Sequence, residues 1–217
     1  MARWAVFDVD GTLLPGTSME QLFALYLLKQ GRIPLRNLFH FLIRAVRTVR
    51  TTRSLDGLKQ EKVYFRGLPQ LQIEQQAEVF FRERILPRLS TEGLDTVRTR
   101  RDQGFRILYL SGSPDFLLRG LQRHLPADYW LAATLEVQNG RFSGRLLKPH
   151  PYGQQKKLYL LELQSSLEID FSQSVVYANH HSDVHHMELF AQAIAVNPTP
   201  RLQQIARQRG WPIVFWI

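Results

Sequence analysis

The chain has 217 residues, of which 44% are hydrophobic, so it is long and apolar enough to bury one sizeable core with an inserted module. This composition excludes a disordered chain, and the lack of any cysteine excludes a disulfide framework, a thiolate metal site and a cysteine nucleophile. The formal net charge of +9 leaves three classes of anionic partner open, namely a substrate, a membrane surface and nucleic acid.

The first residues, "MARWAVFDVDG", hold only a few apolar positions before an acidic turn, so they lack the apolar core of a signal peptide. No uninterrupted apolar run in the sequence approaches the roughly 18 residues that a membrane-spanning helix needs. We therefore expect a soluble, cytoplasmic protein, and the lack of cysteine is compatible with that reducing compartment.

In chain order, β-branched and aromatic residues at 3–9 predict a first strand, and the segment from about 17 to 90 has a helical pattern throughout. Its apolar residues recur at helical spacing, in one set at Leu35, Leu38, Phe39, Leu42, Val46 and Val49 and in another at Ile73, Ala77, Phe80, Phe81, Ile85 and Leu89. Residues 105–113 then predict a buried strand, 114–125 a helix, and 135–147 a hairpin that turns at Asn139-Gly140. The rest predicts helices from about 153, 183 and 200 and strands at 174–179, 193–197 and 212–217.

Strands that alternate with helices predict an α/β fold, in which a Rossmann-like parallel sheet carries helices on both faces. An all-helical block after the first strand predicts an inserted cap. We expect a core made of residues 1–16 and 91–217 and a helical cap domain at residues 17–90.

Polar residues follow three of the predicted strands, at the edge where parallel sheets bind ligands. In chain order these are Asp8, Asp10 and Thr12; then Ser111, Gly112, Ser113 and Pro114; then Asn179 and Asp183. Asp8 and Asp10 are two positions apart, so they leave the strand on the same face. Ser113 suits the cap and Pro114 the first position of the next helix, whose N–H groups would form a phosphate seat. Carboxylate and amide oxygens that converge beside it suit Mg²⁺.

Four motifs in this order resemble the haloacid dehalogenase superfamily of phosphatases: "DVDGT", "SGSP", a lysine on a following helix, and the aspartate of "YANHHSD". The sequence is most similar to the phosphoserine-phosphatase-like branch (subfamily IB), which has a helical cap after the first motif, and the resemblance covers essentially the whole chain. It implies Mg²⁺-dependent hydrolysis of a small-molecule phosphomonoester through an aspartyl-phosphate intermediate.

The resemblance also implies a role for each motif residue. Asp8 would be the nucleophile, and Asp10 would be the general acid and base, with its main-chain carbonyl on the metal. The phosphate would be held by Thr12, Ser111 and the Gly112 N–H, and Lys156 would offset the charge between Asp8 and the phosphoryl group. Lys156 is preferred to Lys157 because "YGQQK" fits the glycine-to-lysine spacing of the family. The Mg²⁺ ligands would be Asp8, Asp10, Asn179 and Asp183.

One motif position departs from the family. The family usually has aspartate where this chain has Asn179, four residues before Asp183. Asparagine still offers an oxygen ligand, but the site carries one negative charge fewer, so it should hold Mg²⁺ less tightly. A catalytically weak enzyme or an inactive phosphate-binding module is therefore an alternative to a working phosphatase.

The cap should select the substrate, because the motifs of the core recognise only the phosphate. In the phosphoserine enzymes a glutamate near position 17 reads the amino group, whereas this chain has Thr17, and the nearest acid is Glu20. Phosphoserine is therefore disfavoured, and we expect another small phosphorylated metabolite.

The cap segment is strongly basic. No acid occurs between Glu20 and Asp56, a stretch that contains Lys29, Arg32, Arg36, Arg44, Arg47, Arg50 and Arg53. A helix there would carry Arg36, His40, Arg44 and Arg47 on one stripe, either as an ordinary solvated face or as a basic amphipathic helix on an anionic membrane. The membrane reading fits an alternative function, a phosphatase of a phospholipid head group of the lysophosphatidate or phosphatidylglycerophosphate type. Nucleic acid is not expected as a partner, because no recognition motif is present.

Four histidines, His180, His181, His185 and His186, follow the last motif strand. His181 and His185 have a helical spacing that can chelate zinc, but "HSDVH" lacks the glutamate of a zinc protease. We expect these histidines to line the mouth of the pocket or to cap a helix, with zinc binding as the alternative, and we give none of them a catalytic role.

Overall fold

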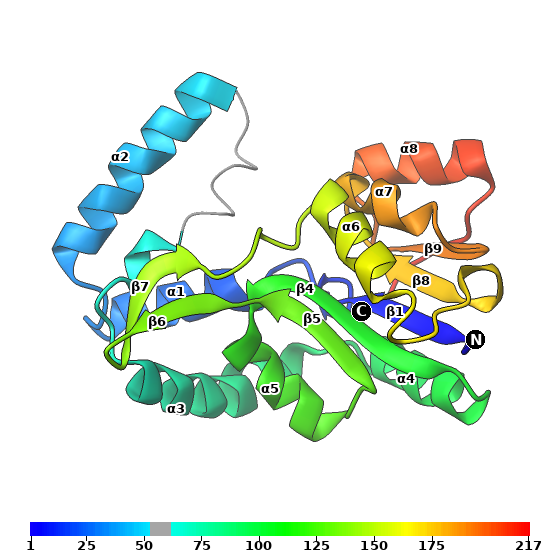
Figure 1. Ribbon diagram of the computed structural model, residues 1–217, viewed down its shortest axis with the longest axis horizontal. Coiled ribbons are helices and arrows are strands. Elements are labelled where there is room, and N and C mark those ends of the chain that lie inside the picture. The colour runs from blue at the N-terminus through cyan, green and yellow to red at the C-terminus, as the bar shows by residue number, and fades with distance from the viewer. Residues whose placement is uncertain (53–61) are drawn as a thin grey trace.

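The fold was analysed in a computed structural model that describes residues 1–52 and 62–217. Within these residues, six parallel strands form one sheet in the order β10-β9-β8-β1-β4-β5 (Figure 1). The strands are β1 (Trp4–Asp8), β4 (Arg106–Pro114), β5 (Tyr129–Ala133), β8 (Val175–Ala178), β9 (Gln192–Val196) and β10 (Ile213–Val214). The predicted α/β fold is confirmed.

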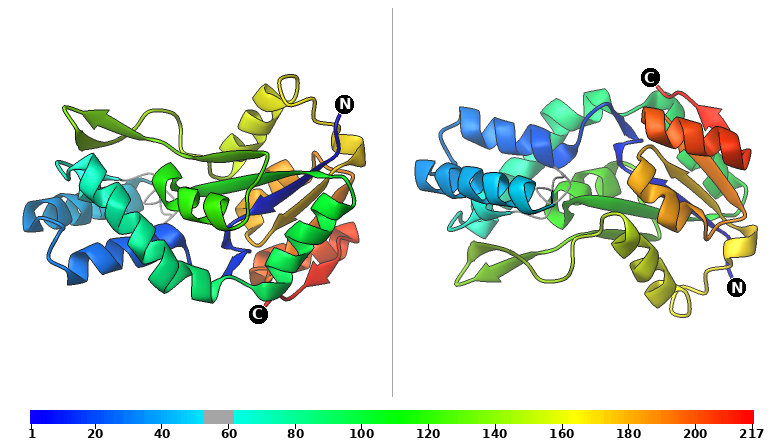
Figure 2. Two further views of the ribbon diagram at one scale, coloured as in Figure 1. Left: turned by 90° about the horizontal axis from the view of Figure 1, so that it is seen from below. Right: turned by 90° about the horizontal axis from the view of Figure 1, so that it is seen from above.

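The strands are apolar on both sides because helices cover both faces of the sheet. Alternate residues of β1 enter two separate apolar layers: Ala5 and Phe7 enter one, and Trp4 and Val6 enter the other. The first layer contains side chains of α4 (Thr91–Asp102) and α5 (Asp115–His124). The second contains side chains of α6 (Gln154–Leu163), α7 (Val184–Met187) and α8 (Pro200–Arg209). The two views of Figure 2 show these two groups of helices on opposite sides of the sheet.

Between β1 and α4 the chain is largely helical. It passes through the short strands β2 (Asp10–Gly11) and β3 (Leu14–Pro15) and then forms α1 (Met19–Lys29), α2 (Leu35–Thr52) and α3 (Gln70–Phe80). A π-helical turn at Phe81–Ile85 follows α3, and 3₁₀ turns lie at Val63–Phe65 and Leu86–Arg88. The part of the predicted helical segment at residues 53–61, which contains Arg53, lies outside the described residues, as does the side chain of Val49.

The predicted hairpin is formed by β6 (Leu135–Gln138) and β7 (Arg141–Leu146). Asn139 and Gly140 at its turn have φ values of 50° and 71°, as a two-residue turn of this type requires. The hairpin pairs with the helical segment: the Gly67 N–H donates to the Phe142 carbonyl at 2.7 Å, and the Phe142 N–H donates to the Leu68 carbonyl at 3.0 Å. The Phe142 ring also packs against Phe65 of that segment, so the hairpin is attached to it by both hydrogen bonds and apolar contact.

Some sequence expectations differ from the structure. The predicted capping role of Ser113, with Pro114 as the first helical residue, is wrong: β4 runs through Pro114, and α5 begins at Asp115 without a side-chain cap from either residue. The Ser113 hydroxyl instead bonds to the first motif and to α1, as described below. The closing strand covers only Ile213–Val214 of the predicted 212–217. Helix α4 and strand β5, an edge strand that is only partly buried, are further elements that the sequence pattern did not predict.

Candidate active site

A buried charge cluster lies at the carboxyl end of the sheet. Asp8 at the end of β1 and Asp183 after β8 are 4% and 2% exposed, and Lys156 from α6 is 4% exposed. The Lys156 ammonium donates to Asp8 Oδ1 at 2.7 Å and to Asp183 Oδ1 at 2.8 Å. Three residues that are far apart in the sequence therefore meet in one site, as the motif prediction required.

The two carboxylates share one cation, and their pKa values diverge accordingly. Burial raises the pKa of Asp8 to about 7, and the neighbouring Asp183 and Asp10 add to this while Lys156 opposes it. Burial also acts to raise the pKa of Asp183, but Lys156 outweighs it and holds that pKa below its ordinary value. Burial would lower the pKa of Lys156, but Asp183 and Asp8 raise it overall, so the lysine stays charged. With both aspartates ionised, the cluster keeps one negative charge in excess.

Asp10 is held in place by the second motif and by the start of α1. Its Oδ2 accepts hydrogen bonds from the Ser111 hydroxyl at 2.6 Å and from the Ser113 hydroxyl at 2.9 Å. Its Oδ1 accepts from the Met19 N–H at 2.7 Å. The carboxylate is therefore fixed beside Asp8 with three donors around it, which is a suitable position for a proton-transferring group.

The proposed phosphate-binding residues lie around this carboxylate pair. Thr12 is fully buried, and its hydroxyl donates to Asp8 Oδ2 at 3.0 Å. Ser111 is also fully buried, and its hydroxyl contacts Asp10 as well as the Ser113 N–H. The structure therefore brings Asp8, Asp10, Thr12 and Ser111 together.

Asn179 lies directly against the first motif. A Cβ atom built on Gly11 would lie 2.1 Å from Asn179 Nδ2, and Gly11 has a φ of 84°. Only glycine leaves both the space and the backbone conformation for this contact. The close approach explains the glycine of "DVDGT" and places the Asn179 amide against the first motif.

Gly112 is packed against His150, a residue that the sequence did not single out. A Cβ on Gly112 would lie 2.9 Å from His150 Cε1, and His150 Nε2 is 2.9 Å from the Gly112 carbonyl oxygen. His150 is 7% exposed, so it is a buried neighbour that packs against the second motif at Gly112. Its only sequence signal was its position shortly before the glycine and lysine of "YGQQK".

The four histidines have different environments. His180 caps the 3₁₀ turn at His181–Asp183, where its Nδ1 accepts from the Ser182 N–H at 3.2 Å, and its ring lies 4.1 Å from that of His181. His185 is exposed, whereas His186 is fully buried with its Nδ1 3.8 Å from Asp183 Oδ1. The capping expectation therefore holds for His180.

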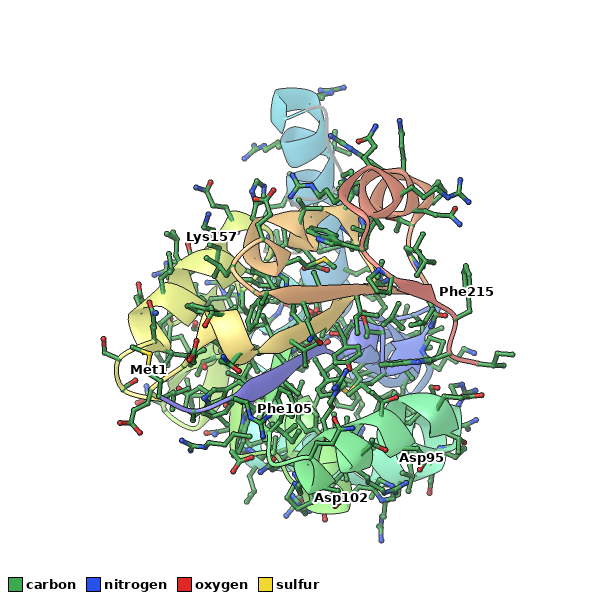
Figure 3. All side chains as sticks on the ribbon, turned by 90° about the vertical axis from the view of Figure 1, so that its right-hand side faces the viewer. Met1, Asp95, Asp102, Phe105, Lys157 and Phe215 are labelled. Carbon is green, nitrogen blue, oxygen red and sulfur yellow. The ribbon has the colours of Figure 1, made fainter. Side chains whose placement is uncertain are left out.

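Lys156 and Lys157 also have different environments. Lys156 is buried in the charge cluster, whereas Lys157 is only partly buried and lies at the surface of α6 (Figure 3). Since successive residues of a helix point in directions about 100° apart, only one of the two can face the site. The structure puts Lys156 there.

A second polar cluster adjoins the site from the helical segment. Glu20, in the first turn of α1, donates its N–H to the Ser113 hydroxyl at 3.2 Å. Its carboxylate accepts from the ammonium of Lys62, which is 1% exposed, and from the Tyr64 hydroxyl. The charge of Glu20 is therefore matched by Lys62. Glu20 was considered from the sequence, but no sequence pattern pointed to its partners Lys62 and Tyr64.

The chemistry of the donors fits Mg²⁺. Asp8, Asp183, the Asn179 amide and the Asp10 carbonyl offer oxygen ligands, and when both aspartates are ionised the excess negative charge of the buried cluster favours a cation. Within residues 1–52 and 62–217, no three His, Cys, Asp or Glu side chains group as a metal site by themselves. A metal here would therefore need the amide and main-chain oxygens as well as the two carboxylates.

Known proteins are similar to this chain in sequence and in fold. A sequence profile of the haloacid dehalogenase-like hydrolases matches residues 5–188. Phosphoserine phosphatase SerB1 of Mycobacterium tuberculosis is 25% identical over 214 residues, which are 96% of this chain and 69% of that protein. Histidinol-phosphatase of Neisseria meningitidis is 23% identical over 231 residues, with 99% of both chains covered. A solved structure of a Bordetella pertussis protein of unknown function has a TM-score of 0.78 and 24% identity, with 99% of this chain and 98% of that chain covered.

Proposed function

Because this chain belongs to the haloacid dehalogenase-like hydrolase family, we propose that it is a Mg²⁺-dependent phosphomonoester hydrolase that works through an aspartyl-phosphate on Asp8. The observation that carries the proposal is the buried contact of Lys156 with both Asp8 and Asp183, with Asp10 held beside them. The substrate would be a small phosphorylated metabolite.

The residues divide the reaction into two steps. An Asp8 oxygen attacks phosphorus while Asp10 gives a proton to the leaving oxygen, which releases the alcohol. Asp10 then takes a proton from a water molecule that attacks the phosphorus, which frees Asp8 and inorganic phosphate. The hydroxyls of Thr12 and Ser111 and the ammonium of Lys156 would hold the phosphoryl oxygens.

The metal would be held by Asp8, Asp183, the Asn179 amide and the Asp10 carbonyl. When bound, it would supply positive charge against the phosphoryl oxygens and between the two carboxylates. Nucleophilic attack, proton transfer and phosphate binding would be carried out by the side chains named above.

The environment of Glu20 argues against phosphoserine as the substrate. Its carboxylate is bound by Lys62 at 2.5 and 2.6 Å and by Tyr64, so its charge is not available for an ammonium group of a substrate. Relatives of similar identity are named for two different substrates, phosphoserine and histidinol phosphate, so their names do not select one.

A second candidate is a phosphatase of a phospholipid head group. The exposed apolar side chains of α2, which are Leu35, Phe39, Leu42 and Val46, favour it, because such a surface would bring the enzyme to its substrate. Within the described residues, no helix has both the length and the apolar content to span a bilayer. A cytoplasmic location remains a prediction.

The test is phosphate release from an aryl phosphate with Mg²⁺ titrated from zero, for the wild type and for Asp8→Asn. Asp95→Asn is the matched control, since Asp95 is an exposed carboxylate on α4 (Figure 3). We expect Mg²⁺-dependent release that Asp8→Asn reduces by at least about 10³-fold and Asp95→Asn leaves unchanged. Equal release by Asp8→Asn and the wild type would refute the mechanism. A wild type that binds phosphate without any turnover would indicate the inactive phosphate-binding module.

A further inference from the structure

Helix α2 exposes its apolar side chains to solvent. Leu35, Phe39, Leu42 and Val46 lie at intervals of four, three and four residues, so they form one stripe along the helix. Their exposed fractions are 82%, 63%, 53% and 51%. We call these four side chains the α2 stripe. A run of exposed large apolar groups on one helix face indicates a surface that binds something.

The helix is fixed to the rest of the molecule near its first turn. The buried Asn37 amide donates to the main-chain carbonyls of Tyr64 at 3.3 Å and Arg66 at 2.6 Å. Phe41 packs edge-on against the Tyr64 ring, with 5.8 Å between the centroids. Beyond this base, α2 projects away from the other elements, as both Figure 1 and Figure 3 show. The contacts of Asn37 and Phe41 therefore attach α2 to the rest of the molecule and leave the α2 stripe exposed.

Basic residues flank the stripe. Arg36, His40, Arg44 and Arg47 follow one another along one side of α2, and all four are exposed. No acidic residue occurs anywhere from 21 to 55. A partner with an apolar surface and negative charge beside it would complement both sets of side chains.

We propose that α2 is a membrane-docking helix, which inserts the α2 stripe into the interface of an anionic lipid bilayer. A bilayer offers both features that the helix needs, since acyl chains receive Leu and Phe side chains while anionic head groups face the arginines. A second copy of the chain fits less well, because pairing two α2 stripes would bring two rows of arginines close together. This docking goes beyond the hydrolase activity and does not depend on it.

The test is flotation of the full chain with vesicles of phosphatidylcholine alone or of phosphatidylcholine mixed with phosphatidylglycerol. The variant is Phe39→Asp with Leu42→Asp, and the matched control is Leu71→Asp, which changes a 68% exposed leucine on α3. Aryl phosphate hydrolysis and the circular dichroism spectrum verify that each variant is folded, because none of these side chains lies at the active site. Asp8→Asn is included, since docking should survive loss of turnover.

We expect the wild type, Leu71→Asp and Asp8→Asn to float with the anionic vesicles and not with phosphatidylcholine alone, and added salt to weaken this binding. The α2 variant should lose at least about tenfold in vesicle affinity while its hydrolysis is unchanged. Failure of the wild type to bind anionic vesicles at low salt would overturn the proposal, as would equal binding by the α2 variant. A wild-type dimer that the α2 variant dissociates, without vesicle binding, would overturn it in favour of self-association.

Discussion

The active site and α2 depart from the usual distribution of residues in opposite ways. At the active site, three ionisable side chains, Asp8, Lys156 and Asp183, are at most 4% exposed. On α2, four large apolar side chains are at least 51% exposed. Buried charge costs stability unless it is paired, and an exposed apolar stripe indicates a binding surface, so each is explained by a partner. The charged groups of the active site have their partners within the chain, whereas we propose that the α2 stripe has its partner in an anionic bilayer.

The largest effect should come from breaking the buried cluster. Lys156→Ala leaves two buried carboxylates without their cation, so we expect a loss of about 3–5 kcal/mol in the free energy of unfolding. We also expect kcat/KM to fall by about 10²–10³-fold, because the phosphoryl charge loses its ammonium partner. Lys157→Ala is the matched control and should change both quantities little. Urea denaturation and aryl phosphate kinetics measure the two effects; comparable losses in Lys157→Ala would mean that the lysine was misassigned.

Helices α1 and α2 should respond differently to the same truncation. Phe23 of α1 is fully buried against Phe80 and Phe116, so we expect Phe23→Ala to cost about 3–5 kcal/mol of stability. Phe39 of α2 is 63% exposed, and Phe39→Ala should stay within about 0.5 kcal/mol of the wild type. Denaturant unfolding compares the two. A large loss in Phe39→Ala would show that the α2 stripe is covered in solution by the protein itself.

The anchor of α2 should be sensitive at Asn37. Asn37→Ala removes two hydrogen bonds from a buried amide and leaves the Tyr64 and Arg66 carbonyls without it, so we expect a loss of about 1–3 kcal/mol. Hydrogen exchange of the α2 amides should become faster, since the helix loses its attachment. His40→Ala, an exposed neighbour, is the control. Unchanged exchange in Asn37→Ala would contradict the role of this residue as an anchor.

The smallest effect concerns Asn179, the proposed metal ligand. Asn179→Asp adds a negative charge beside the cluster, so half-maximal activity should need roughly three- to tenfold less Mg²⁺. The fold should not change, since the two side chains have nearly the same shape. A Mg²⁺ titration of hydrolysis measures this shift. An unchanged Mg²⁺ requirement would show that position 179 does not face the metal.

Local sequence patterns predicted much of this fold. The apolar run before Asp8 predicted β1, Asn139-Gly140 predicted the hairpin turn, and the alternation of strands and helices predicted the parallel sheet. These features depend on residues close together in the chain, where periodicity and turn preference act directly. The strand β5 was missed because its residues are only partly buried at the sheet edge.

The residues of the candidate site that stand in motifs could be predicted from the sequence. The residues that contact the site only through tertiary packing could not. Asp8, Asp10, Ser111, Lys156 and Asp183 stand in recognisable motifs, and the structure brings them together. The contacts of His150 with Gly112 and of Lys62 and Tyr64 with Glu20 had no such signal. Each joins residues at least 38 positions apart, so only the fold could reveal it.

Sequence patterns alone indicate most of the elements, the motif residues at the strand ends and the two-sided character of α2. The three-dimensional fold shows that Lys156 rather than Lys157 enters the site, that Ser113 holds Asp10 rather than caps α5, and that the apolar side of α2 faces solvent. The physical reason is that periodicity defines the faces of a helix, whereas what covers each face depends on elements far away in the chain.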